Sequence, residues 1–243
     1  MKYRETLYKN YHTNQSGRAS LTDAKSLFVR EKIRFANEIL PIITDLPKDI
    51  QIVDMGCGSG SLVSLLVDNH FSEVTGVDLS NEQVELAKQL GVSNVIQGDI
   101  IEWLNNQKTK MDLVLGMDII EHFTKDELVD LLLGVKKHLK PGGKVIFRTP
   151  NLDAPLATVF ANGDFTHENY MNLSSAEQLM MSVGFNDVKI HSSNMDVNGI
   201  FKNLVRKCVW AILKFKLKLT LFATGRSTRG LIFSPNLIIE ATL

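Results

Sequence analysis

The chain has 243 residues, 44% of them apolar and 22% charged, which is typical of a globular protein with one sizeable core. Its 27 basic and 27 acidic residues cancel, and two distant cysteines, Cys57 and Cys208, argue against a disulfide framework or a structural zinc site. The first residues lack the apolar run of a secretory signal, and no long apolar window free of charge predicts a membrane span. We therefore expect a cytoplasmic protein.

Short apolar runs alternate with helical patterns along most of the chain. The runs predict strands at residues 51–56, 73–80, 94–99, 111–118, 144–150, 188–193 and 236–243. Capping boxes at Thr124/Glu127 and Ser174/Glu177 predict two helix starts, and Pro141 to Gly143 predict a turn. The alternation indicates an α/β fold, a Rossmann-like seven-stranded, mostly parallel sheet with helices on both faces.

Two regions fall outside the alternation. We predict that residues 1–47 form an N-terminal helical cap and that residues 48–243 form the main domain. Residues 194–235 predict a basic helical insertion before the last strand, because apolar residues from Phe201 to Phe222 recur at spacings of four and three. After Lys214 the pattern also alternates as in a strand.

The charge of this insertion suggests a partner. Between Val197 and Ile239 there are eight basic residues and no acidic one, while the rest of the chain carries 19 basic and 27 acidic residues. Three interpretations remain open. The insertion is a lid or a homodimer interface; or residues 200–222 contact the inner face of an anionic membrane; or the basic face binds an anionic acceptor, such as a nucleotide sugar, a lipid-linked glycan or RNA.

A glycine-rich loop follows the first strand, in the stretch VDMGCGSG. Gly56, Gly58 and Gly60 permit a sharp turn and close approach to a ligand. The dinucleotide pattern GxGxxG is not met, because Ser61 stands at its sixth position, and no phosphate-binding GK[ST] is present. Three carboxylates, Asp54, Asp78 and Asp99, lie at the ends of the first three predicted strands. They would repel a pyrophosphate, so we expect a ligand with an ammonium group instead.

This loop resembles the first motif of the class I S-adenosylmethionine-dependent methyltransferases. The likeness extends over about residues 48–190, through VTGVDLS, IQGDI and LKPGGKVIFRTPN. It implies S-adenosylmethionine as cofactor, with Asp78 accepting the ribose hydroxyls and Asp99 near the adenine. The cofactor-binding residues implied are Asp54, Gly56, Cys57, Gly58, Gly60, Asp78, Leu79, Asp99, Ile100 and Met117.

The stretch MDIIEHF ends the fourth strand and would lie beside the transferable methyl group. Its Asp-x-x-Glu-His spacing resembles the metal-binding segment of ubiquinone-biosynthesis O-methyltransferases and small-RNA 2′-O-methyltransferases. The resemblance implies a magnesium or manganese site of Asp118, Glu121, His122 and His167, although Asp118 is shorter than the usual glutamate. The alternative is catalysis without metal, with His122 as the base and Asp118 and Glu121 in support.

The acceptor side carries a further likeness. The TPN strand end, the FTHENYMNLSSAEQLMMSVGF segment and the final IFSPNLIIEA look similar to methyltransferases of bacterial surface-polysaccharide biosynthesis. We therefore expect O-methylation of a sugar hydroxyl, free or on a nucleotide- or lipid-linked acceptor. The alternatives are a metal-assisted O-methyltransferase for a catechol-like molecule or an RNA 2′-hydroxyl, with nucleic acid the less favoured, and a non-catalytic cofactor-binding or membrane-associated scaffold.

Overall fold

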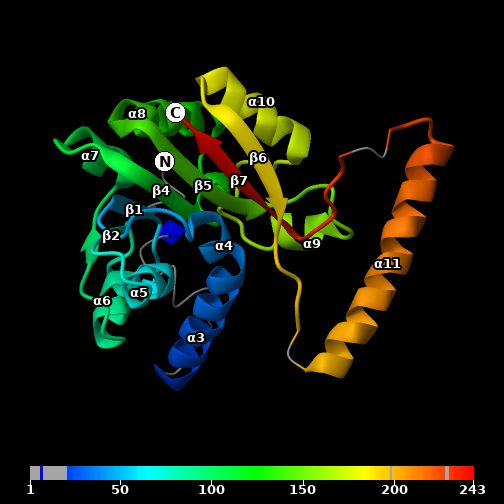
Figure 1. Cartoon of the computed structure of the whole chain (residues 1–243), viewed down its shortest axis with the longest axis horizontal. Helices are drawn as coiled ribbons and strands as arrows, with labels where there is room; N and C mark the ends of the chain where they lie inside the picture. Colours follow the sequence, from blue (N-terminus) through cyan, green and yellow to red (C-terminus); the bar gives the residue numbers. More distant parts are fainter. Residues whose placement is uncertain (1–5, 8–20, 198, 228–229) are drawn as a thin grey trace.

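The computed structural model describes residues 6–7, 21–197, 199–227 and 230–243. Its centre is a seven-stranded sheet in the order β3-β2-β1-β4-β5-β7-β6 (Figure 1). The strands are β1 (Gln51–Met55), β2 (Glu73–Asp78), β3 (Val95–Gln97), β4 (Met111–Met117), β5 (Leu139–Pro150), β6 (Asn186–Ser192) and β7 (Asn236–Thr242). Strands β1 to β5 pair in parallel, and β7 is antiparallel to both neighbours. The predicted fold is confirmed.

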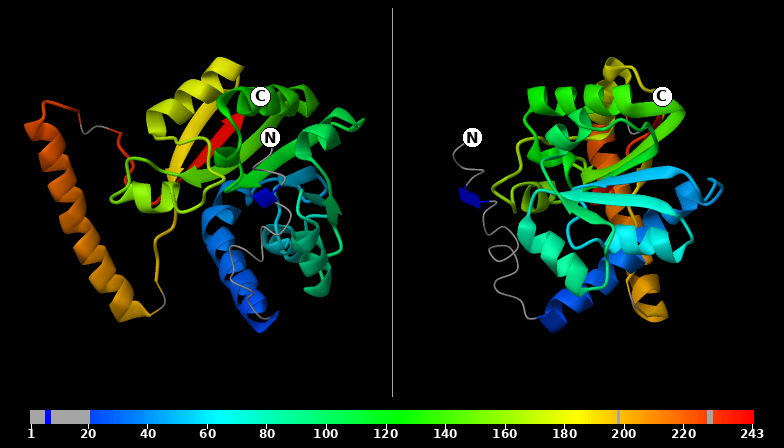
Figure 2. Two further views of the ribbon diagram at one scale, coloured as in Figure 1. Left: turned by 180° about the vertical axis from the view of Figure 1, so that it is seen from behind. Right: turned by 90° about the vertical axis from the view of Figure 1, so that its left-hand side faces the viewer.

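Helices cover both faces of the sheet (Figure 2). The first face carries α7 (Ile100–Asn105), α8 (Lys125–His138) and α10 (Leu173–Val183), and the second carries α3 (Leu21–Glu38), α4 (Leu40–Ile43), α5 (Ser61–Asp68) and α6 (Asn81–Gln89). Each side has its own apolar core: Leu128, Leu131 and Met180 belong to one, and Phe35, Leu62 and Val84 to the other. Burial on both faces explains why the strands are continuous apolar runs.

Most predicted strand ends lie within two residues of the observed ones, and two other boundaries were wrong. Strand β5 begins at Leu139 and not at residue 144, because Leu139 already pairs with Met111 across a shift in register, and the predicted Pro-Gly-Gly turn lies inside the strand. Helix α10 is capped by Asn172 and not by Ser174. The Asn172 side chain accepts from the Ser175 amide, and the Ser175 hydroxyl accepts from the Asn172 amide, so the capping box lies two residues earlier than predicted.

The N-terminal region is helical where it is described. Helix α3 packs along α5, and its last residue, Glu38, is buried against Arg148 of β5, with 3.2 Å between Oε2 and Nε. Residues 1–5 and 8–20 of the predicted cap lie outside the described residues. The boundary of the cap at residue 47 stays a prediction.

The basic insertion forms one helix, α11 (Ile200–Ala223), to its end, so the strand-like alternation after Lys214 does not interrupt it. The helix projects from the body of the protein, as two opposite views show (Figures 1 and 2), and none of its residues is buried. Two short elements complete the described part of the chain: the 3-10 turn η1 (Ile120–His122) and α9 (Ala157–Ala161). Among the described residues, no helix has both the length and the hydropathy needed to cross a bilayer.

Candidate active site

The glycine loop joins β1 to α5 at the carboxyl edge of the sheet. Gly56 has φ +69°, and a Cβ atom there would stand 2.8 Å from the Ile119 side chain, so only glycine fits beside the β4 loop. The amide of Gly56 donates to the carbonyl of Val77, 2.8 Å away, which ties the loop to β2. Gly60 has a positive φ as well but faces Val92, so its role is in the turn and not in the lining of the pockets.

Asp78 ends β2 and orders the loop from the other side. One carboxylate oxygen accepts from the Gly58 amide and the other from the Ser80 amide, both at 2.8 Å. The carboxylate borders a cavity of about 230 Å³. That cavity is also lined by the predicted cofactor residues Leu79, Asp99 and Ile100, together with Phe123. Its apolar and carboxylate walls suit an adenosine.

Asp99 has a second task. Its Oδ1 accepts from the amides of Ile101 and Glu102, so the side chain caps helix α7. The residue is exposed at the mouth of the smaller cavity. Capping fixes one oxygen, and the other is the atom placed to meet a ligand.

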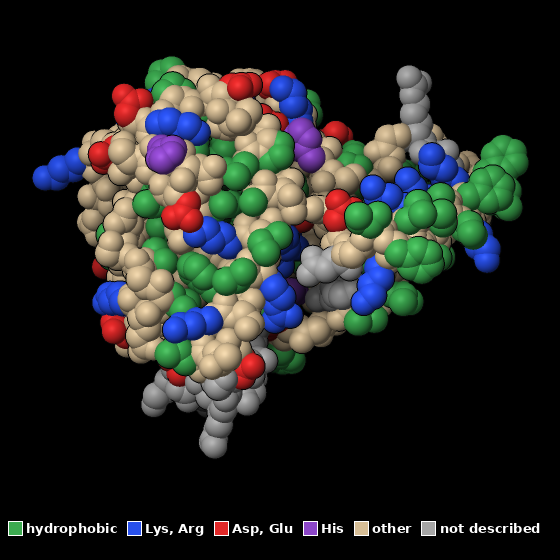
Figure 3. Space-filling model, turned by 60° about the horizontal axis from the view of Figure 1, so that its bottom comes forward, with side chains coloured by type: hydrophobic (Ala, Val, Ile, Leu, Met, Phe, Trp, Pro, Cys, Tyr) green, Lys and Arg blue, Asp and Glu red, His purple; other side chains and the backbone are tan. Residues whose placement is uncertain are grey.

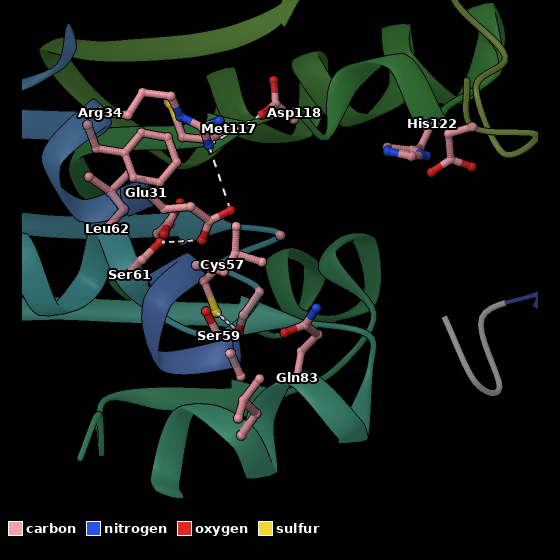
Figure 4. A pocket seen from close by; sticks show the side chains of 18 of the residues that line it. Glu31, Arg34, Cys57, Ser59, Ser61, Leu62, Gln83, Met117, Asp118 and His122 are labelled. Atoms are coloured by element: carbon pink, nitrogen blue, oxygen red, sulfur yellow. Dashed lines mark hydrogen bonds and ion pairs between the residues drawn. The ribbon is translucent and has the colours of Figure 1, made fainter. Parts of the chain in front are cut away.

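A larger cavity of about 500 Å³ adjoins the smaller one (Figure 4). The predicted residues Asp54, Cys57 and Met117 line it, with Asp54 buried at the end of β1. Burial and the nearby Asp78 carboxylate raise the pKa of Asp54 well above its usual range. No hydrogen-bond partner reaches its Oδ1 from the described residues. A buried carboxylate in this state is set to receive a cation or a donor from a ligand.

Helix α3 supplies a wall of this cavity that the sequence did not identify. Glu31 and Arg34, labelled in Figure 4, line it together with Phe35. Glu31 accepts from the Ser61 hydroxyl at 3.1 Å, and burial raises the pKa of its carboxyl. Arg34 Nε is buried and has no hydrogen-bond partner among the described residues. The signal in the sequence was the 3–4 spacing of Glu31, Arg34 and Glu38, which puts three charged groups on one helix face.

The two cavities meet at the residues that line both of them: Gly56, Gly58, Gln83, Asp118 and His122. In Figure 4, Gln83 and His122 lie on one side of the cavity, away from Arg34 and Met117. A ligand that occupied both cavities would therefore pass directly over the glycine loop and beside His122.

Asp118 does not join the other predicted metal ligands. It is a non-glycine residue with φ +54°, and its carboxylate pairs with the buried guanidinium of Arg148 and lies 4.0 Å from Arg34. The place of Asp118 in a metal site therefore stays a prediction, and the structure groups only the other three residues. The αL backbone turns the carboxylate toward the two arginines.

The remaining three predicted groups do converge. One ligand atom from each of Glu121, His122 and His167 lies within 4.8 Å of the other two, a grouping found by searching the described residues. The two imidazole rings meet edge to face with centroids 4.8 Å apart. Glu121 is buried, and its Oε2 has no hydrogen-bond partner in the described part of the chain.

Hydrogen bonds fix the tautomers of both histidines. His167 Nδ1 donates to the carbonyl of Ala161 at 2.7 Å, so its lone pair is on Nε2. His122 Nδ1 lies 2.8 Å from the Thr166 hydroxyl, whose own proton goes to the Asp164 carboxylate at 2.7 Å. The hydroxyl must therefore accept from His122, which again leaves the lone pair on Nε2. This orientation by a second partner is typical of histidine ligands and bases.

The segment with His167 is held against the β4 loop by backbone bonds. The amides of Glu168 and Asn169 donate to the Glu121 carbonyl at 2.7 and 3.0 Å, and the Asn169 side chain donates to the Phe123 carbonyl at 2.7 Å. Thr124 caps α8 through the predicted capping box with Glu127, so residues 118–123 lie before the helix. Their carbonyl groups can therefore accept these hydrogen bonds. This docking brings His167 to His122.

Burial sets the protonation of the cluster. It lowers the pKa of His122 to about 4, with His167 as the next cause, so the imidazole is neutral at pH 7. Burial, with the Asp118 charge as a lesser cause, raises the pKa of Glu121 well above its usual range. The site thus holds a neutral His122 imidazole beside the His167 ring, and a carboxyl group that only a cation or a donor would keep ionised.

Comparison with known proteins gives the following relatives. A family model described as a methyltransferase domain matches residues 27–190. The ubiquinone biosynthesis O-methyltransferase of Rickettsia conorii is 29% identical over 155 residues, covering 62% of this chain and 52% of that protein. The protein of the same name from Bartonella bacilliformis is 32% identical over 129 residues, 51% of this chain and 50% of that protein. The chain spans about half the length of these curated relatives.

A solved structure has the same fold. The SAM-dependent methyltransferase from Archaeoglobus fulgidus superposes with a TM-score of 0.62 at 20% identity, over 96% of this chain and 99% of that one. At this identity the superposition bears on the fold alone.

Proposed function

Because the chain belongs to the class I S-adenosylmethionine-dependent methyltransferases, we propose that it methylates a hydroxyl oxygen of a small acceptor at the junction of the two cavities. The observation that carries the proposal is the position of His122. Its ring borders both cavities, and its Nδ1 is held by Thr166. A hydroxyl must lose its proton as it attacks a methyl group, and a neutral imidazole at that place can accept it.

The residues present fit the cofactor. The smaller cavity has the Asp78 carboxylate for ribose hydroxyls, and the larger one has two buried polar atoms, Asp54 Oδ1 and Arg34 Nε, without partners among the described residues. A carboxylate and a guanidinium match the ammonium and carboxylate of an amino-acid moiety. When bound, S-adenosylmethionine supplies the electrophilic methyl group. The roles assigned to these residues remain proposals.

His122 would take the acceptor proton at Nε2. Its Nδ1 proton stays on the ring and is donated to the Thr166 oxygen, and Thr166 in turn is fixed by Asp164. As the ring becomes an imidazolium, the Asp164 carboxylate, the last group in this series of hydrogen bonds, stabilises the positive charge. The burial that lowers the His122 pKa also keeps the ring unprotonated until the acceptor arrives.

The donor set also fits a divalent metal ion. Glu121, His122 and His167 would hold it, since both histidines have Nε2 lone pairs and Glu121 Oε2 is a buried oxygen without a partner in the described residues. One carboxylate and two imidazoles suit manganese or a softer ion better than magnesium. Such an ion would lower the pKa of an acceptor hydroxyl. Glu121 then serves to hold a cation, which would keep its carboxylate ionised.

The acceptor class has two candidates. A sugar hydroxyl follows from the likeness to polysaccharide methyltransferases, which the curated relatives do not support. A catechol-like phenol follows from the likeness to the ubiquinone biosynthesis O-methyltransferases. Both classes offer two adjacent hydroxyls. An RNA acceptor has less support, because the lysines of α11 line neither of the two cavities.

The test is turnover with labelled cofactor and a matched panel of acceptors: nucleotide sugars, free sugars, catechols and short RNAs. We expect adenosylhomocysteine and a methyl ether with a sugar or a catechol. Stripping with a chelator and re-adding manganese or magnesium separates the two mechanisms, because activity unaffected by chelation contradicts the metal. Cofactor binding without turnover on every acceptor class would favour the scaffold interpretation.

A further inference from the structure

Helix α11 exposes a continuous apolar stripe, which we call the outer stripe: Phe201, Val205, Ile212, Phe215, Leu219 and Phe222. The three phenylalanines are 76%, 68% and 77% exposed. Spacings of three, four and seven place all six on one side of a helix that is about 36 Å long. Single exposed apolar residues need no explanation, but a stripe of this length indicates a surface that contacts a membrane or another molecule.

The outer stripe faces away from the protein. The half-buried residues of α11, among them Arg206, Trp210 and Leu217, lie on the opposite side, where Arg206 and Trp210 border a groove toward the body. Figure 3 shows apolar side chains covering much of the projecting part, with Lys and Arg interspersed among them. No residue of α11 lines either cavity of the candidate active site, so the expectation of a lid has no support.

Lysines border the outer stripe on both sides. At about 100° per residue, Lys202 and Lys216 fall along one edge of the stripe, and Lys207 and Lys218 along the other, where they also border the groove toward the body. The helix carries six basic residues and no acidic one. Neither these four lysines nor Lys214 forms an ion pair with another described residue.

We propose that the outer stripe of α11 lies on an anionic phospholipid bilayer. An apolar face between two rows of lysines can enter the boundary between headgroups and acyl chains while the ammonium groups reach the phosphates. A second copy of the chain is the less favourable occupant, because two paired α11 helices would bring their lysine rows together without any acidic partner on either helix. The helix would lie on the surface, in keeping with the lack of a span among the described helices.

The test uses the full chain in flotation with vesicles of phosphatidylcholine, alone or mixed with phosphatidylglycerol. We expect binding to the mixed vesicles, and weakening as salt is raised. The triple variant F201S/F215S/F222S should lose more than about a hundredfold in partitioning. L133S/M181S, which removes exposed apolar side chains from α8 and α10, is the matched control and should bind as the unchanged protein does.

A second set of variants tests the charge. K207Q/K216Q/K218Q should weaken binding to the anionic vesicles by about a hundredfold, at roughly fivefold for each lysine. K108Q/K110Q/K125Q makes the same change in net charge on the body and should have no such effect. Cofactor binding in solution should be unchanged in all variants, which separates this proposal from the proposed function.

The proposal is overturned if the α11 variants bind vesicles as well as their controls do, or if the unchanged chain does not bind anionic vesicles. In the second case, a dimer of the unchanged chain that F201S/F215S/F222S dissociates would identify the outer stripe as a subunit interface instead.

Discussion

His122 and His167 lie side by side, and each ring donates a hydrogen bond from Nδ1 to an oxygen of the 161–166 segment, which leaves Nε2 as the nitrogen with a lone pair. Their ring centroids are 4.8 Å apart. Two rings this close can share a proton or a cation. The relationship makes His122 the residue whose loss is most informative.

Replacing His122 with Gln should lower kcat by about 100- to 10,000-fold, the range expected for loss of a general base. The affinity for the cofactor should stay within about threefold, since Asp78 and the glycine loop are unchanged. Steady-state kinetics and equilibrium cofactor binding measure the two effects. His138→Gln, at a histidine on α8 that bonds the Gly134 carbonyl, is the control; equal losses in both variants would contradict the assignment.

The stability of the protein should fall as pH is lowered from 6.5 toward 4. The folded chain leaves His122 unprotonated down to about pH 4, whereas the unfolded chain protonates it near 6.5, so acid favours unfolding in this window. Between pH 7 and pH 5 the loss from this residue is about 2 kcal/mol of unfolding free energy. Urea unfolding should show that the His122→Gln variant loses less unfolding free energy than the unchanged protein over that interval. Equal losses in the two proteins would contradict the lowered pKa of His122.

Replacing Arg34 with Gln should weaken cofactor binding by about 10- to 100-fold, the contribution of a hydrogen bond to a charged group. The reason is the buried Nε that lines the larger cavity without a partner among the described residues. Isothermal titration with adenosylhomocysteine measures the change. Arg30→Gln, on the exposed side of the same helix, should have no effect; if Arg34→Gln also binds normally, the amino-acid moiety lies elsewhere.

Replacing Arg148 with Met should cost about 3–5 kcal/mol of unfolding free energy, because it leaves Glu38 and Asp118 without their buried cation. Adding Glu38→Gln to the variant should recover part of the loss. The control is Lys140→Met, which breaks a partly exposed pair with Asp112 and should cost no more than about 1 kcal/mol. Equal costs for the two pairs would show that burial of Arg148 does not matter.

The fold was predictable because each level of the sequence indicated the same answer. Apolar runs, caps and glycines placed the strands, and a helix boundary at Thr124 separated residues 118–123 from α8. The errors were at element ends. Asn172 caps α10 although Ser174 also suits that position, and β5 extends through the glycines because its neighbour β4 offers partners that far. Such choices depend on tertiary contacts and not on local pattern.

The site was predictable where it follows strand ends and not where it depends on packing. Glu121, His122 and His167 were expected together, and the structure assembles them. Asp118 shares their stretch, but two arginines from α3 and β5 attract its carboxylate. Arg34 is distant from every motif, so only the docking of α3 against α5 reveals it at the cavity.

Helix α3 has a double attachment, to the cavity through Arg34 and to the sheet through Glu38. A ligand that binds Arg34 therefore also stabilises the docked helix, and the undocked helix leaves the cavity without one wall. The two equilibria are linked, so occupancy of the cavity and order in α3 rise together. Amide hydrogens of α3 should then exchange more slowly when the cofactor is bound, and the extent of slowing would report the free energy that the helix contributes to binding.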